Sequence, residues 1–178
     1  MRKITLAALA LAGSMALIGV TAVPAFAVTT DDTDVTVTVA AGVLSITVPG
    51  TTALSTVLPG ENSTATLGAT VVTDARAGIV NWTATVILPA LTGDALNSTE
   101  TIPTTGASYL ADAATLTGSP TLAGPTLKTD LSTAAVTSQA TTAVSGNNSA
   151  SWTATRTVPI TAQVLADTYS GTMTQSVS

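Results

Sequence analysis

The sequence "VNWTATVILP", at positions 80–89, has the alternation expected of a strand with one buried face. The residues of the apolar face would be Val80, Trp82, Ala84, Val86 and Leu88. The sequence "ASWTATRTVP", at positions 150–159, repeats the letters WTAT and places a proline at the same spacing. Both tryptophans of the chain lie in these two copies. We therefore predict two strands in similar environments rather than a true internal repeat.

Other stretches of the chain also alternate with a period of two. They predict strands at 35–39, 43–49, 64–76, 134–146 and 168–178, of which the first two would form an N-terminal hairpin. Glycine and proline recur between 90 and 131, which predicts a long loop with at most short strands. Residues 161–168 would form a loop or a single helical turn. Threonine, the dominant polar residue, favours strands. Short strands separated by turns predict an all-β fold, a single antiparallel β-sandwich of Greek-key, Ig-like or jelly-roll-like type.

The first 27 residues have the organisation of a secretory signal peptide. Arg2 and Lys3 form a basic start, a continuous apolar run follows, and Ala25-Phe26-Ala27 matches the small-x-small cleavage pattern. Cleavage after Ala27 would leave a secreted domain at 28–178. The alternative is a retained membrane anchor, because the apolar run is nearly long enough to span a bilayer. The cleavage pattern favours secretion, so we expect an extracellular protein.

Composition excludes several classes of function. The chain contains no cysteine and no histidine, which removes disulfides, ordinary zinc sites, haem ligation and triads that depend on histidine. After the expected cleavage only Arg76, Lys128 and Arg156 would remain against ten carboxylates. Such a chain is a poor partner for nucleic acid or anionic lipid, because both need clustered bases. We predict no cofactor, no metal, no nucleic-acid partner and no membrane association after cleavage.

Three motifs together resemble a known family. They are "VTDARAGIVNWTATV" (72–86), "GNNSASWTATRTVPI" (146–160) and the ending "ADTYSGTMTQSVS" (166–178). In this order they look like the WxL-type cell-surface domains of Gram-positive bacteria, and especially their small secreted relatives in actinobacteria. The resemblance implies an all-β surface domain held non-covalently on the cell wall through peptidoglycan. Family members carry leucine two residues after each tryptophan, where this chain has Ala84 and Ala154, so only Trp82 and Trp152 match.

Five residues are candidates for binding a wall polymer or a surface partner. Trp82 and Trp152 would either pack in the core or act as stacking platforms for sugar rings. Arg156 would form a cation–π contact with Trp152 or pair with a carboxylate such as Asp74. Asp74 and Arg76 would be a turn-capping carboxylate and a surface base, while the resemblance implies a polar corner of a wall-binding site.

Acidic residues supply weaker alternatives. Asp31, Asp32 and Asp34 would bind Ca²⁺ only weakly, because the spacing lacks the glycine and distal glutamate of a calcium loop. They are more typical of a solvated leader. Glu61 and Glu100 would provide the two carboxylates of a glycoside hydrolase, but both lie in loop-like sequence and the chain has few aromatic residues.

The sequence therefore predicts a non-catalytic cell-surface protein that associates with wall polymer or a surface partner. The second hypothesis is a structural or adhesive subunit that self-assembles through its edge strands. The third is a small secreted hydrolase.

Overall fold

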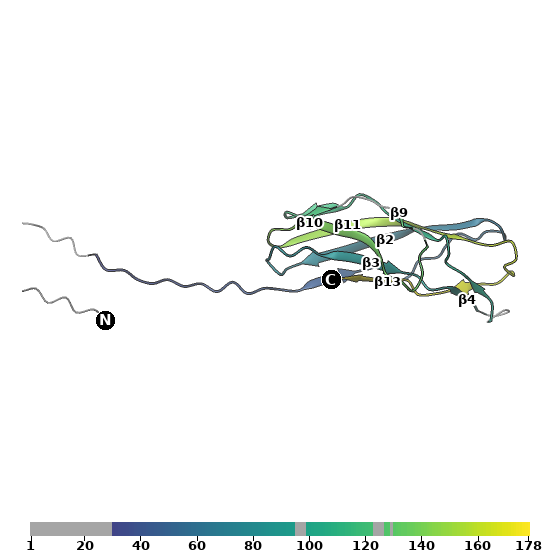
Figure 1. The fold of residues 1–178 in the computed structure, drawn as a ribbon, viewed down its shortest axis with the longest axis horizontal. Coiled ribbons are helices and arrows are strands. Elements are labelled where there is room, and N and C mark those ends of the chain that lie inside the picture. Colours follow the sequence, from purple (N-terminus) through teal and green to yellow (C-terminus); the bar gives the residue numbers. More distant parts are fainter. Residues whose placement is uncertain (1–29, 95–98, 123–126, 129) are drawn as a thin grey trace, which may run out of the picture. The chain divides into compact units, whose positions relative to one another are not determined.

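The computed structural model describes residues 30–94, 99–122, 127–128 and 130–178. Residues Val39–Ser178 form one compact unit, and the residues before Val39 belong to a second. The described residues form strands, turns and loops (Figure 1). Within these ranges no helix is long and apolar enough to span a bilayer. The predicted signal peptide at 1–27 lies outside the described residues.

The compact unit is built from antiparallel sheets, as the alternation predicted. The first sheet has the order β1 (Leu44–Thr47), β2 (Asn62–Asp74), β11 (Asn148–Pro159), β6 (Ser108–Ala111) and β9 (Leu127–Lys128), and β7 (Thr115–Thr117) also pairs with β11. The second has the order β13 (Thr174–Val177), β3 (Thr83–Ile87), β10 (Val136–Ala143) and β8 (Thr121–Leu122). A small third sheet joins β12 (Tyr169–Ser170), β4 (Leu91–Gly93) and β5 (Thr101–Ile102). Neighbouring strands are often distant in sequence, which confirms a sandwich-like all-β fold.

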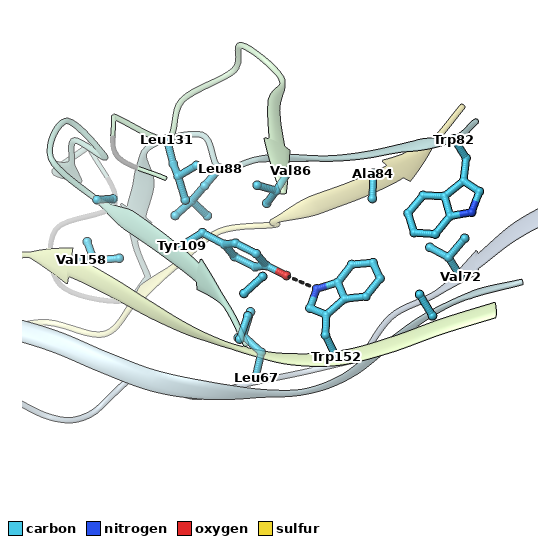
Figure 2. Close-up of a cluster of buried hydrophobic side chains, with 14 of the residues drawn as sticks. Leu67, Val72, Trp82, Ala84, Val86, Leu88, Tyr109, Leu131, Trp152 and Val158 are labelled. Atoms are coloured by element: carbon cyan, nitrogen blue, oxygen red, sulfur yellow. Dashed lines mark hydrogen bonds between the residues drawn. The ribbon is translucent and has the colours of Figure 1, made fainter. Parts of the chain in front are cut away.

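The two WTAT copies lie in opposite sheets. Trp82 directly precedes β3 and Ala84 lies in it, while Trp152 and Ala154 belong to β11. All four side chains are buried, and Figure 2 shows the two strands contributing to one core from its two sides. Burial of one large apolar side chain contributes about 1.5–3 kcal/mol, so these strands carry much of the stability of the unit. The opening motif therefore marks two facing core strands.

The N-terminal hairpin predicted at 35–49 is wrong. Residues 35–39 form no strand, and the side chains of Val35 and Val37 are 87% and 88% exposed. β1 forms as predicted but pairs with β2, and Val48 is exposed beyond its end. Alternation of apolar and polar residues indicates that a strand could bury one face. It does not identify the strand with which it pairs. A two-stranded hairpin alone is marginal in water, whereas β2 already belongs to a sheet with an apolar face.

A β-bulge interrupts the predicted strand at 64–76. Trp152 lies opposite Thr70 and Ala154 lies opposite Leu67, so β2 has one more residue than β11 between these pairs. The extra residue allows Leu67 and Thr70 both to face the core, although they are three positions apart. Gly68 lies inside this bulge, a common position for glycine in a strand.

Two further details of the predicted strands are corrected. Val80 does not share the buried face of Trp82: it is 64% exposed, because β3 begins only after the turn that follows Arg76. The terminal strand predicted at 168–178 divides into β12 and β13, which pair in different sheets. The division falls at Gly171, where an added Cβ would lie 2.7 Å from Cδ2 of Leu91.

Candidate functional site

Both tryptophans are buried in the core. Trp82 is 1% exposed and Trp152 is 2% exposed. The indole nitrogen of Trp82 donates to Oδ1 of Asn148 at 3.1 Å, and that of Trp152 donates to the hydroxyl of Tyr109 at 3.1 Å (Figure 2). Both polar atoms are therefore satisfied inside the core, as buried indoles require. In this structure neither ring offers a face to an external sugar.

Asp74 is the centre of a buried polar corner. Its carboxylate accepts from Nε of Arg76 at 2.9 Å and from Nη2 at 3.0 Å, and it also accepts the backbone N–H of Arg76. Nδ2 of Asn148 donates to the same carboxylate at 3.4 Å. Because Asn148 also accepts from Trp82, the corner links β2, β11 and the start of β3. The pairing of Arg156 with Asp74 is wrong, since Arg76 occupies that position.

Electrostatics keep the Asp74 corner charged. The hydrogen bonds from Arg76 lower the pKa of Asp74 below its ordinary value, and this effect exceeds the opposing effect of burial. The same contact raises the pKa of Arg76. A bidentate contact between guanidinium and carboxylate is among the stronger polar interactions in proteins. The turn-capping interpretation of Asp74 fits this geometry, although the carboxylate is buried.

A second polar network crosses the core beside Trp152. The Tyr109 hydroxyl accepts from Trp152 and donates to Oε1 of Gln175 at 3.3 Å, and the hydroxyl of Thr70 donates to the same oxygen. Gln175 belongs to β13 of the second sheet, so this network also joins the two sheets. Burial raises the pKa of Tyr109, which keeps its hydroxyl neutral.

Arg156 differs from the other candidates because no carboxylate of the described residues forms an ion pair with it. Its position on β11 alternates in phase with Trp152, Ala154 and Val158, so the side chain lies on the buried face of the strand. It is 8% exposed, and its Nε has no hydrogen-bond partner. Among the described residues no carboxylate forms a salt bridge with it. Desolvation lowers its pKa, but an arginine still keeps its charge in a protein.

Arg156 lines a cleft of about 600 Å³, here called the Arg156 cleft. Two loop segments, 52–59 and 164–171, supply most of the remaining lining. The apolar lining includes Leu54, Leu91, Ile102, Ile160, Val164 and Leu165. Hydroxyl groups come from Ser55, Thr56, Ser63, Thr168 and Ser170. Asp167 also belongs to the lining. A concave, largely apolar site with a few polar groups is the usual form of a small-ligand site.

A second cleft, of about 370 Å³, lies beside β8. It is lined by Leu116, Pro120, Leu122, Gln139 and small residues of the loop at 113–114. Oε1 of Gln139 is buried without a partner, but no charged side chain lines this cleft. It therefore offers less to distinguish one ligand from another.

The acidic candidates do not assemble a site in the described residues. Oε2 of Glu61 accepts from the backbone N–H of Leu58 at 3.0 Å and so caps a turn. Glu100 lies exposed at the start of β5, where its carbonyl accepts from Gly93. Asp31, Asp32 and Asp34 are exposed. No group of three acidic residues placed to hold a metal ion occurs in the described part of the chain.

Comparison of the sequence with protein-family models and with curated proteins finds no match.

The Arg156 cleft is the site that sequence reasoning missed, although Arg156 was a candidate. A signal was present: Arg156 is the one charged residue on the alternating face of Trp152, Ala154 and Val158. The lining from 52–59 and 164–171 gave no signal, because a loop's position over a strand end depends on long-range packing. The role of Asn148 was also missed, since the sequence Gly-Asn-Asn at 146–148 is typical of a turn and gives no sign of a buried amide.

Proposed function

We propose that this chain is a non-catalytic, secreted cell-surface domain that associates with a wall polymer or a surface partner through the Arg156 cleft. The observation that carries the proposal is the buried guanidinium of Arg156, which has an unpartnered Nε and lines a cleft of about 600 Å³. A buried charge without a partner costs free energy, so a fold retains one most readily where a ligand neutralises it.

The chemistry of the cleft supports binding rather than catalysis. A guanidinium orients an anion but does not exchange protons near neutral pH. The chain has no histidine or cysteine to supply a base or a thiol nucleophile. In the lining, the Ser63 hydroxyl donates to the backbone carbonyl of Ser55, which occupies its proton. The N-terminal signal pattern and the resemblance to wall-associated domains support a place at the cell surface.

A sedimentation assay with purified wall sacculi tests this function. We expect the chain to co-sediment saturably, and Arg156→Gln to reduce the bound fraction at least tenfold. Lys128→Gln is the matched control, because it removes one positive charge elsewhere and should bind as the unsubstituted chain does. Absence of co-sedimentation, or an equal loss with both variants, would overturn the proposal.

One observation favours a second candidate function, a structural subunit that self-assembles through strands. Val35, Val37 and Val39 alternate with threonines and are 87%, 88% and 79% exposed. β13 has β3 on one side only, and Ser178 exchanges both backbone hydrogen bonds with Thr83. By antiparallel alternation, the backbone groups of Gln175 and Val177 face the free edge. The occupant of that edge would be residues 35–39 of a second copy.

Size-exclusion chromatography with light scattering tests this alternative. We expect a mass that rises with concentration, and Val37→Lys should abolish the rise. Thr36→Lys is the matched control, because it places the same charge on the opposite face of the segment. A constant monomer mass at high concentration would exclude self-assembly.

A further inference from the structure

We propose that the Arg156 cleft receives the free carboxylate of a short peptide with small apolar side chains. This inference rests on the proposed function, whose ligand it names. The terminal carboxylate of such a peptide would meet the guanidinium of Arg156 in the lining of the cleft. The methyl-sized side chains of the peptide would lie against the apolar lining residues.

The guanidinium of Arg156 favours an anion as the ligand. Arg156 projects from the buried face of β11, between Ala154 and Val158, with no carboxylate of the described residues in a salt bridge. Its Nε lacks a partner in an environment where nearly all buried donors have one. The planar fork of a guanidinium matches the two oxygens of a carboxylate. A bound carboxylate would therefore pair with the guanidinium and neutralise its charge.

The charge balance favours a singly charged ligand. Arg156 is the one base in the lining, and the lining also contains the carboxylate of Asp167. A phosphate carries up to two negative charges, so its second charge would be left without a base beside an acidic residue. A carboxylate carries a single charge, for which Arg156 is the pairing base in the described lining.

The lining favours a small apolar body rather than a sugar ring. Leu54, Ile160 and Val164 are among the aliphatic residues around the cleft, while Tyr169 is the single aromatic residue among those that line it. The Tyr169 hydroxyl already donates to the carbonyl of Leu165 at 3.0 Å. Hydroxyl side chains of both lining segments, such as Thr56 and Ser170, are suited to hydrogen-bond the amides of a peptide. A volume of about 600 Å³ lies in the range typical of small-ligand sites.

Nitrogen-15 NMR of the arginine side chains tests the ligand directly. The full sequence contains only Arg2, Arg76 and Arg156, so the Nε–H signals are few, and Arg156→Lys assigns the one of interest. The probes are N-acetyl-dialanine with a free carboxylate, the same peptide with an amide end, and inorganic phosphate. We expect the free acid to shift the Arg156 signal saturably and leave the Arg76 signal unmoved. The amide should bind at least tenfold more weakly.

Equal shifts with the acid and the amide, tighter binding of phosphate, or no shift with the acid would each overturn the inference. Calorimetry on Arg156→Gln and Lys128→Gln supplies the second measurement. Only Arg156→Gln should lose binding of the free peptide acid. The sacculi assay separates this inference from the proposed function. If the chain co-sediments with sacculi and excess N-acetyl-dialanine does not compete, the surface function stands and the inferred peptide ligand is wrong. If the chain binds the dipeptide but does not co-sediment with sacculi, the inferred ligand stands and the proposed surface function is wrong.

Discussion

Trp82 and Asn148 join the two sheets through a buried hydrogen bond of 3.1 Å. Asn148 also donates to Asp74, so a single amide connects the first WTAT strand to the Asp74–Arg76 pair. Each of these residues lies in one of two sequence motifs, 72–86 or 146–160. These two motifs therefore meet at a buried structural corner.

Asn148→Ala should destabilise the fold by about 1–3 kcal/mol, because it leaves the indole N–H of Trp82 buried without an acceptor. Urea unfolding followed by tryptophan fluorescence measures the change. Asn147→Ala is the matched control: this neighbouring side chain is exposed, and its loss should change stability by less than about 0.5 kcal/mol. Equal effects of the two substitutions would contradict a role for the buried amide.

The Asp74 corner should make stability depend on acid pH. The contact with Arg76 lowers the pKa of Asp74 in the folded state. A lowered pKa means that its contribution is fully present above the unfolded value, near 3.8, and is lost as pH falls through the folded value. Thermal unfolding of the unsubstituted chain and Asp74→Asn between pH 2 and pH 7 measures this. We expect the difference in Tm to be large near neutrality and to shrink towards pH 2. Asp94→Asn, which removes an exposed carboxylate, is the matched control.

The core was largely predictable from sequence because it depends on local alternation. Trp82, Ala84, Val86 and Leu88 all face inwards as their period of two predicted. Alternation fails where the backbone changes phase. The bulge near Gly68 shifts the inward positions of β2 by one, and a single-sequence pattern shows a glycine there but not its effect.

The Arg156 cleft was much less predictable. Arg156, the basic residue of its lining, is visible in the sequence as a charge on an apolar face. The lining segments 52–59 and 164–171 have no sequence pattern that places them beside Arg156. Pairing is equally non-local. The alternating valines at 35–39 have the pattern of a strand, yet the described structure leaves them exposed, because alternation supplies a face and not a partner.

Both tryptophans should resist quenching by iodide and emit at short wavelength, because each is at most 2% exposed. Trp82→Phe and Trp152→Phe isolate the two signals. Added wall fragments should leave the quenching of both unchanged, since the proposed ligand contacts the Arg156 cleft, whose lining contains neither indole. A quenchable tryptophan that wall fragments protect would contradict this and place the binding surface at an indole.

Arg156→Met should raise the stability of the fold while it removes ligand binding. The substitution replaces a buried charge whose Nε has no partner with an apolar side chain, which removes the cost of keeping that charge away from water. Arg76→Met is the matched control and should act in the opposite direction, because it leaves the buried carboxylate of Asp74 without its guanidinium. Thermal unfolding of both variants, with binding of N-acetyl-dialanine measured in parallel, distinguishes a functional arginine from a structural one. Loss of stability in Arg156→Met as large as that in Arg76→Met would mean that Arg156 holds the fold together. A gain in stability coupled to loss of binding is expected where the folded state retains an unfavourable charge for its ligand.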